Sequence, residues 1–183
     1  MAFLETDRLI LRLWRPEDLD PFAALCADPE VMEYFPAPLT REETAAMIGR
    51  MVEMHKKDGL CFMACDRKDT GEFIGFVGLK MSDIIHDDQF APSFEIGWRL
   101  ARKHWGEGFA PEAARAVLHY AFDVLKAPEV VAMTAVENLK SRKVMEKIGM
   151  TYNPKDDFDH PSVEAGHPLR RHVLYRIKPG QIK

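Results

Sequence analysis

Apolar residues recur along this chain with two periods, and the shorter period predicts strands. Alternating apolar and polar residues are typical of a half-buried strand, and short apolar runs between turn residues are consistent with a buried one. Gly71 lies in the turn of an expected hairpin, and Gly97 predicts a bulge or a close backbone approach. The segments with strand patterns are TDRLILRLW (6–14), LCFMACD (60–66), FIGFVGLKM (73–81), SFEIGWRL (93–100), VVAMTAV (130–136) and RRHVLYRIK (170–178).

The longer period, with apolar residues three and four positions apart, predicts four helices. The first is RPEDLDPFAALCAD (15–28). The second begins with a capping box of Thr40 and Glu43 and ends at Gly59. The fourth is NLKSRKVMEKIGM, capped by Asn138. The third has one apolar face, formed by Ala113, Ala114, Val117, Leu118, Ala121, Phe122 and Leu125. The resulting order, β-α-α-β-β-β-α-β-α-β, predicts an α/β protein with helices packed on a mixed sheet.

Length and charge narrow the class of protein. A chain of 183 residues predicts one domain spanning 1–183. The net charge of −4 argues against a nucleic-acid binder with a basic surface. The start of the chain is too charged for a signal peptide, and no apolar run approaches the roughly 20 residues that span a bilayer. We therefore expect a cytoplasmic protein, monomer or homodimer, with no membrane or nucleic-acid partner.

The three cysteines do not form a disulfide framework. Cys61 and Cys65 lie four positions apart in a predicted strand, which separates them by about 13 Å. That distance is too long for a disulfide. We expect both to be small core residues.

The stretch KHWGEGFAPEAA (103–114) places two glycines just before a helix. Such glycines can serve a tight turn, because they tolerate positive φ. They can also form an anion cradle, in which backbone N–H groups and a helix N-terminus converge on one ligand. The P-loop pattern G-x-x-x-x-G-K-[ST] is absent, and Pro111 stands where a dinucleotide fingerprint needs a small residue. A nucleotide-binding regulator is therefore not supported.

Three blocks in order resemble the GNAT superfamily of acetyl-CoA-dependent N-acetyltransferases, in particular the ribosomal-protein N-terminal acetyltransferase type. They are LETDRLILRLWRPEDLDPF, EIGW…HWGEGFAPEA and N-x-x-S…EKIGM. The resemblance covers residues 4 to about 150. It implies a twisted, mixed, mostly antiparallel sheet with splayed central strands and flanking helices. The splayed strands are 93–100 and 130–136 here.

The resemblance also implies which residues bind acetyl-CoA as a co-substrate. It implies no metal. The pantetheine arm would contact backbone groups of the strand before the glycines and the start of the last helix. The pyrophosphate would lie on the glycine loop, whose first position is Lys103 where the family usually has Gln or Arg. The implied set is Ile96, Trp98, Leu100, Lys103, Gly106, Glu107, Gly108, Phe109, Ala110, Asn138 and Ser141. Glu107 and Glu112 place carboxylates near the expected anion.

Acetyl transfer to an amine needs a proton acceptor, and Glu95 is our candidate. Strand alternation places it on the face opposite Phe94 and Ile96. A surface or ion-paired glutamate is the competing interpretation. Polar residues of the loop 82–89 are weaker candidates for the base. His104 is more typical of a residue that orders a loop, and the HDD of 86–88 is a poor metal site because three adjacent ligands have poor geometry.

The leaving thiolate needs a proton as well. Many GNAT enzymes have a tyrosine in the last helix where this chain has Met145, and a thioether has no proton to give. Ser141 lies one helical turn earlier on the same face. In relatives of the ribosomal type a serine at this position has the role of proton donor. A serine that only caps the helix, with water as the donor, is the alternative.

Two functions remain open. The chain is expected to be an N-acetyltransferase that acts on a primary amine, either a small molecule or a peptide or protein N-terminus. The alternative is a catalytically weak acyl-CoA-binding module. The acceptor is expected beside 33–40, 82–92 and 153–172, whose acids could attract a cation. These acids are Asp83, Asp87, Asp88, Asp156, Asp157 and Asp159.

Overall fold

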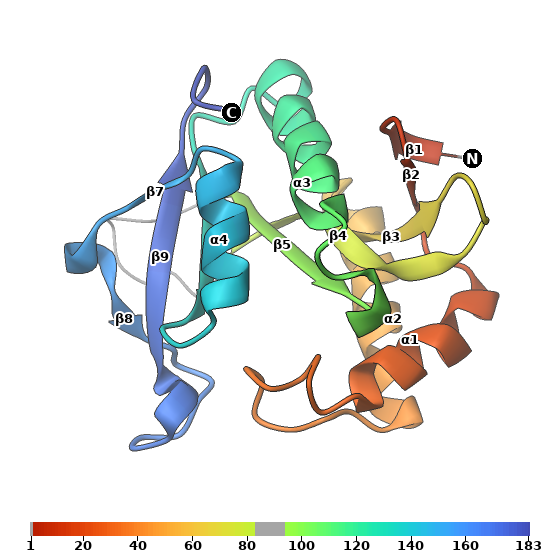
Figure 1. The fold of residues 1–183 in the computed structure, drawn as a ribbon, viewed down its shortest axis with the longest axis horizontal. Coiled ribbons are helices and arrows are strands. Elements are labelled where there is room, and N and C mark those ends of the chain that lie inside the picture. Colours follow the sequence, from red (N-terminus) through yellow and green to blue (C-terminus); the bar gives the residue numbers. More distant parts are fainter. Residues whose placement is uncertain (1, 83–93) are drawn as a thin grey trace.

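The computed structural model describes residues 2–82 and 94–183 (Figure 1). All six predicted strands and four predicted helices are confirmed, and three short strands are additional. The elements are β1 (Ala2–Glu5), β2 (Leu9–Arg12), α1 (Leu19–Ala27), α2 (Arg41–Asp58), β3 (Phe62–Arg67), β4 (Phe73–Met81), β5 (Phe94–Leu100), α3 (Phe109–His119), β6 (Val130–Ala135), α4 (Leu139–Lys147), β7 (Thr151–Tyr152), β8 (Phe158–Asp159) and β9 (Arg171–Ile177).

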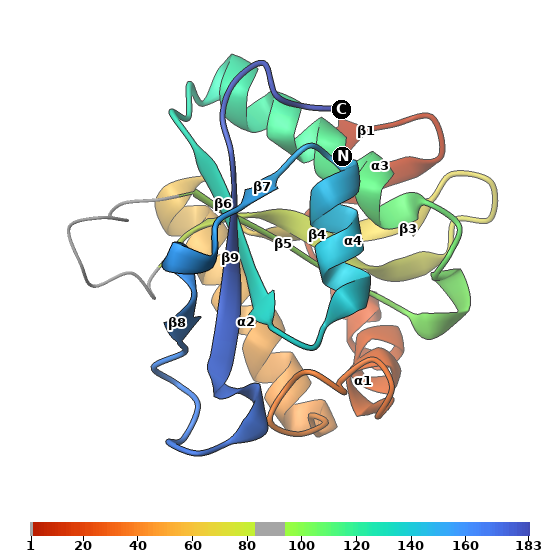
Figure 2. The same cartoon turned by 60° about the vertical axis from the view of Figure 1, so that its left-hand side comes forward.

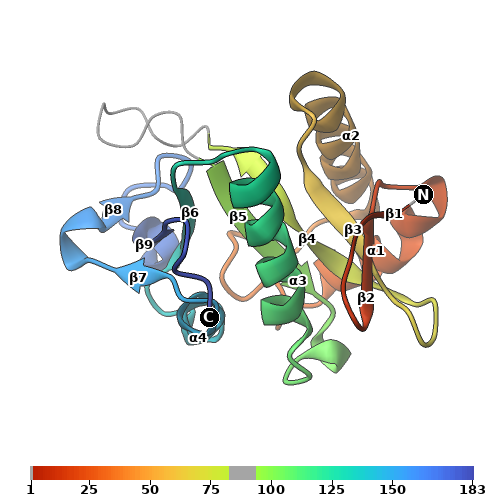
Figure 3. The ribbon, with the colours of Figure 1, turned by 90° about the horizontal axis from the view of Figure 1, so that it is seen from above.

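The strands form one sheet in the order β1-β2-β3-β4-β5-β6-β9-β7, with β8 beside β9. Every neighbouring pair is antiparallel except β5 and β6, which are parallel. Helices α1 and α2 cover one face of this sheet, and α3 and α4 cover the other (Figure 3). The pattern of the sequence predicted a mixed sheet with packed helices, and the family resemblance implied that it is mostly antiparallel; both are confirmed.

The predicted capping residues and the apolar helix face lie where the sequence placed them. The Thr40 side chain accepts a hydrogen bond from the N–H of Glu43, and Gly59 ends α2 with a left-handed φ of 70°. The apolar face of α3 is buried on the sheet, with Ala113, Val117 and Leu118 fully inaccessible. All three cysteines are free and buried, and burial raises the pKa of Cys61 to about 11 and of Cys65 to about 12.

Three local expectations need correction. The first predicted strand begins at Leu9 rather than at Thr6, because the Thr6 backbone and hydroxyl bond to Leu9 and close a tight turn between the additional strand β1 and β2. The third helix continues past α3 as a π-helical turn (Tyr120–Val124). No bulge interrupts β5, and the close approach at Gly97 is made by a side chain rather than by another backbone: a Cβ there would lie 2.9 Å from the Phe62 ring.

Candidate active site

The two central strands of the sheet separate after their first residues. β5 and β6 pair only through Phe94 with Val130 and Glu95 with Val131. β5 stays paired with β4, and β6 with β9. The sheet is therefore split from Ile96 onward, and the split opens toward the carboxyl ends of both strands (Figure 2). The expected splay of the central strands is confirmed.

Backbone groups of β5 point into this split. In a strand, successive residues direct their N–H and C=O groups to opposite neighbours. The N–H of Ala101 donates to a carbonyl oxygen of β4 at 2.9 Å. The backbone groups of Ile96, Trp98 and Leu100 therefore point away from β4, and from Trp98 onward they face the side that β6 leaves open. The Leu100 carbonyl accepts the indole N–H of Trp105 at 2.8 Å, so its N–H is the group that remains for a ligand.

The glycine loop lies at the open end of the split and leads into α3. Five consecutive N–H groups donate to no protein group within residues 2–82 and 94–183. They belong to Gly106, Glu107, Gly108, Phe109 and Ala110. The first turn of a helix lacks intrahelical acceptors and carries the positive end of the helix dipole. Convergent donors of this kind suit an anion.

Both glycines need their lack of a side chain. Gly106 has φ of 83° and Gly108 has φ of 80°, a left-handed conformation that strains other residues. A Cβ on Gly106 would meet nothing within 4 Å, and a Cβ on Gly108 would meet only Arg8 Nη2, at 3.5 Å. The loop is thus a tight turn that also leaves room in front of its donors. This space and the donors fit a pyrophosphate.

Arg8 ties the glycine loop to the N-terminal hairpin. Its Nη1 donates to the carbonyl oxygen of Glu107 at 2.9 Å, and its Nε donates to Glu112 at 2.6 Å. Its guanidinium lies 4.5 Å from the centroid of the Phe109 ring. The sequence analysis missed this residue, because its partners lie about a hundred positions away and no local pattern links them.

Glu112 faces the hairpin rather than the expected anion. Burial alone would raise the pKa of Glu112, but hydrogen bonds from Thr6 and Arg8 outweigh it and lower the pKa. The carboxylate is therefore ionised and neutralised by Arg8 at neutral pH. The Glu112 carboxylate therefore does not repel an anion bound on the glycine loop.

Lys103 and His104 are engaged elsewhere. The Lys103 ammonium pairs with Glu72, in the turn before β4. His104 is buried, and its Nε2 lies 3.4 Å from the same carboxylate. Burial lowers the pKa of His104, so the ring is neutral at neutral pH. His104 thus orders the loop, as its position suggested, and Lys103 can meet a phosphate only by leaving Glu72.

Comparison with known proteins identifies the family. The model of the acetyltransferase (GNAT) domain matches residues 8–151. The chain belongs to the GNAT acetyltransferase family. It is 35% identical over 151 residues to the uncharacterized protein YkkB of Bacillus subtilis, covering 82% of this chain and 86% of YkkB. It is 33% identical over 150 residues to the uncharacterized N-acetyltransferase p20 of Bacillus licheniformis, covering 81% and 82%.

The solved structures agree with this assignment. The crystal structure of the acetyltransferase from Agrobacterium tumefaciens matches 95% of this chain and 92% of that chain, with a TM-score of 0.75 and 28% identity. The protein is an acetyl-CoA-dependent N-acetyltransferase with the GNAT fold, as the resemblance implied. These matches favour an enzyme over a binding module.

Arg8→Gln should weaken acetyl-CoA binding to this GNAT domain about 3- to 10-fold, the scale of one partly exposed ion pair. The loop would lose its anchor on the Glu107 carbonyl while the glycines stay in place. Calorimetric titration with acetyl-CoA measures the change, with Arg50→Gln on the exposed side of α2 as the charge-matched control. Equal affinities of both variants would show that Arg8 does not support the loop.

The start of α4 lies beside the glycine loop. Lys140 Nζ is 4.4 Å from the centroid of the Trp105 ring, which joins the two segments across the split. Asn138 caps the helix: its Oδ1 accepts the N–H of Ser141 at 3.1 Å, and its amide donates to Thr134. Asn138 therefore holds α4 in place with its side chain.

Ser141 is not the cap of this helix. Its backbone N–H is bound by Asn138, and in the described part of the chain its hydroxyl makes no hydrogen bond. Met145, where many GNAT enzymes have tyrosine, is 2% exposed and belongs to the core. A tyrosine at 145 would therefore have to be accommodated in the core. The Ser141 hydroxyl therefore has no partner among the described residues, and its role as proton donor stays a prediction.

Glu95 lies at the apex of the split, in the last paired position of β5. It is buried, and its carboxylate accepts the Ser82 hydroxyl at 3.0 Å and lies 3.3 Å from Lys80 Nζ. The competing interpretation, an ion-paired glutamate, therefore describes its surroundings. The apex of the split is also the place where a proton acceptor would be needed. The role of Glu95 as the base therefore stays a prediction.

The acids expected near the acceptor are partly neutralised. Asp156 pairs with Arg176 at 2.8 Å, and Asp159 lies 3.3 Å from both Arg170 and Arg171. Asp157 accepts the hydroxyl of Tyr152. Asp83, Asp87, Asp88 and the HDD of 86–88 lie outside the described residues. Within the described ranges, no cluster of three or more His, Cys, Asp or Glu could hold a metal, and no helix is long and apolar enough to cross a membrane.

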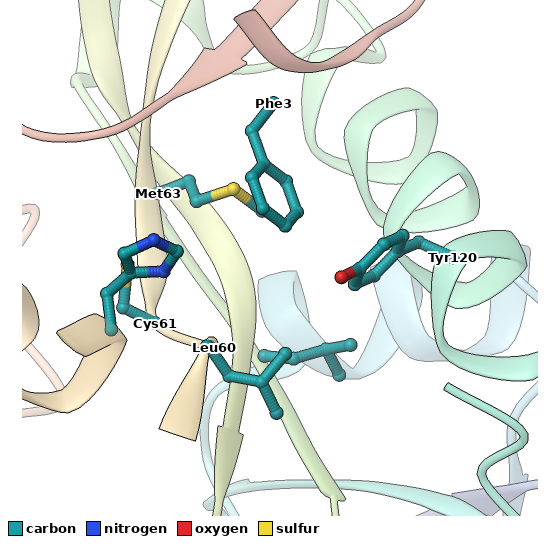
Figure 4. A pocket seen from close by; sticks show the side chains of 8 residues that line it. Phe3, Leu60, Cys61, Met63 and Tyr120 are labelled. Carbon is teal, nitrogen blue, oxygen red and sulfur yellow. The ribbon is translucent and has the colours of Figure 1, made fainter. Parts of the chain in front are cut away.

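Two hollows lie outside the split. One, of about 10 Å³, is lined by Phe3, Leu60, Cys61, Met63 and Tyr120 (Figure 4). It holds one water molecule at most, so it is no substrate site. The other is an open groove of about 570 Å³ between α1 and residues 101–103. It adjoins the start of the glycine loop.

Proposed function

We propose that the enzyme binds the pyrophosphate of acetyl-CoA on the N–H groups of residues 106–110 and the pantetheine arm in the split beside β5. The observation that supports this is the row of five unpartnered donors at the open end of the split. Asn138 and Ser141 would complete the site from α4. Lys103 would join it on release from Glu72.

The residues of the split suit direct attack of an amine on the donor. Acetyl-CoA, when bound, supplies a thioester whose carbonyl carbon accepts the lone pair of the amine. Glu95 would take the proton from the amine, directly or through a water molecule. A backbone N–H of β5 that points into the split would hold the oxyanion. The Ser141 hydroxyl would give a proton to the leaving sulfur.

Ser141→Ala should lower kcat about 10- to 100-fold, the lower end of general acid–base catalysis. A thiolate of CoA leaves readily near neutral pH, so the loss should not be larger. The affinity for acetyl-CoA should hardly change, since Asn138 alone caps α4. Steady-state kinetics beside acetyl-CoA titration separates the two effects. Ser141→Thr, which keeps a hydroxyl, should retain more activity, and unchanged turnover in Ser141→Ala would assign the proton to water.

The acceptor is proposed to be a primary amine, either a small molecule or the N-terminus of a peptide or protein. The segments 33–40, 82–92 and 153–172 would surround it, as the sequence analysis expects. An acetylation screen with small amines, aminoglycosides and N-terminal peptides tests this. Release of CoA with at least one of these classes supports the proposal, and release with none of them contradicts it.

The remaining expectations stay proposals as well. We infer a single domain over 1–183 that acts in the cytoplasm without nucleic acid, membrane or metal. The net charge of −4 supports the lack of a nucleic-acid partner. A monomer and a homodimer are equally compatible with the chain.

A further inference from the structure

Arg99 in β5 is a buried arginine to which the described part of the chain offers no carboxylate. It is only 8% exposed. Its Nη1 lies 3.3 Å from Cys26 Sγ and 3.9 Å from Met47 Sδ, and its guanidinium lies over the rings of Phe35 and Phe76, at 4.1 and 5.5 Å. Within residues 2–82 and 94–183, neither Nε nor Nη2 makes a hydrogen bond. One edge of the guanidinium is thus unsatisfied.

Arg12 shows how the same chain satisfies an arginine that it buries for structure. Arg12 is 4% exposed. Its guanidinium is enclosed by the carboxylates of Asp18 and Asp66, with four hydrogen bonds between 2.5 and 2.8 Å. Arg99 has a thiol, a thioether and aromatic rings instead. Buried arginines are almost always paired with an acid, because an unpaired buried charge is costly.

The pKa values of the two arginines shift in opposite directions for this reason. Burial lowers the pKa of Arg99, and Cys26 offsets this only in part. Burial opposes the charge of Arg12 too, but Asp18 and Asp66 outweigh it and raise the pKa. Sulfur atoms and aromatic rings are weak substitutes for a carboxylate. Arg99 would therefore gain from an anion, and the residues that the structure describes do not supply one.

Arg99 lies on the face of β5 from which an acceptor would reach Glu95. Alternation places Glu95, Gly97 and Arg99 on one face of the strand. The contacts of Arg99 with Cys26 of α1 and Met47 of α2 identify this face as the one that α1 and α2 cover. The glycine loop leads into α3, which packs on the opposite face (Figure 3). An amine that gives its proton to Glu95 thus approaches from the side of Arg99.

We propose that Arg99 binds a carboxylate of the amine acceptor through its Nε and Nη2. The proposal rests on the proposed function, because it takes the amine to react beside Glu95. The guanidinium fork matches a carboxylate with two parallel hydrogen bonds. The Cα atom of Glu95 lies about 13 Å from that of Arg99 along the strand. The Phe62 ring packs on Gly97 between them, so the acceptor has to pass this ring. The acceptor is therefore an amine whose carboxylate follows several bonds later, as in an ω-amino acid or a short acidic peptide.

Phe35 is the side chain that covers this site. It is 37% exposed, and it belongs to the segment between α1 and α2, which contains neither helix nor strand over 28–40. A partly exposed side chain outside the helices and strands can change its rotamer without disturbing the sheet. Entry of a carboxylate would replace part of the Arg99–Phe35 contact.

Matched acceptors test the charge requirement. We expect the wild type to acetylate 6-aminohexanoate with a kcat/KM about 10- to 100-fold above that for 6-aminohexanamide, the range of a charged hydrogen-bonded pair. Arg99→Met should remove this preference, and Arg50→Met, which removes an exposed charge, should keep it. A preference for the amide, or an equal preference in wild type and Arg99→Met, overturns the proposal.

A binding measurement decides the question even if neither amine turns over. Hexanoate and hexanamide are titrated into the wild type, Arg99→Met and Arg99→Lys in the presence of CoA. The proposal expects hexanoate to bind more tightly than hexanamide to the wild type, with a smaller difference in Arg99→Lys and none in Arg99→Met. Hexanoate that binds no better than hexanamide to the wild type overturns it, whereas failure of turnover alone would count against the proposed function.

The melting temperature of Arg99→Met tests whether the role of Arg99 is purely structural. Methionine fits a site lined by sulfur and aromatic groups, so Tm should stay level or rise. A large fall in Tm, with the selectivity for carboxylates unchanged in the folded fraction, would show that Arg99 serves packing and would overturn the proposal.

Discussion

Gly106→Val is expected to abolish measurable acetyl-CoA binding while the fold survives, a loss of at least about 100-fold in affinity. The valine side chain would occupy the space in front of the loop donors, where no protein atom lies within 4 Å of a Cβ. It would also strain the left-handed backbone at φ of 83°. Calorimetric titration with acetyl-CoA measures the loss, and Gly108→Val should behave alike.

A matched control separates the effect of backbone strain from the effect of filling the space in front of the loop donors. Gly180 lies near the end of the chain with φ of 84°, and a Cβ there would also meet nothing within 4 Å. Gly180→Val carries the same strain away from the split. It should lower Tm about as much as Gly106→Val and keep the affinity of the wild type. If Gly106→Val binds acetyl-CoA normally, the loop is only a turn.

Glu95→Gln is expected to lower kcat about 100-fold at neutral pH, within the range of a general base. Part of the loss should return at higher pH, where more of the amine is unprotonated. The affinity for acetyl-CoA should stay within about 2-fold, because the residue does not touch the glycine loop. Initial rates from pH 6 to 10 give the profile.

The ion pair with Lys80 supplies the control for this variant. If Glu95 only balances Lys80, Lys80→Met should reproduce the fall in Tm of Glu95→Gln, and both should keep wild-type rates across the pH range. If Glu95 is the base, the two variants should differ in their pH profiles. A pH-independent wild-type rate in Glu95→Gln would leave the glutamate a structural role.

Local signals in the sequence predicted most of the fold. The Thr40–Glu43 box, the Asn138 cap and the apolar face of α3 depend on residues close in sequence, so their patterns are visible without the structure. The hairpin of β1 and β2 was missed because a turn of three residues leaves the alternation on both sides intact. The splay of β5 and β6 came from a family resemblance, since nothing in either strand alone specifies where pairing stops.

The site was predictable in its backbone and less so in its side chains. The glycines marked the loop because positive φ demands a particular residue type. Arg8 and Glu112 were not recognised as partners, since about a hundred residues separate them. Arg99 was visible only as a polar position in a strand. Its burial without a carboxylate is a property of α1, α2 and β5 together, which no local pattern encodes.

The most direct test of the central claim follows both products of one reaction. The protein is incubated with acetyl-CoA and each amine of the panel, and free CoA thiol and acetylated amine are quantified together by mass spectrometry. The account predicts amine-dependent release of CoA in equal amount to the acetylated amine, lost in Gly106→Val and kept in Gly180→Val. Tight binding of acetyl-CoA without amine-dependent release would contradict it and indicate a binding module.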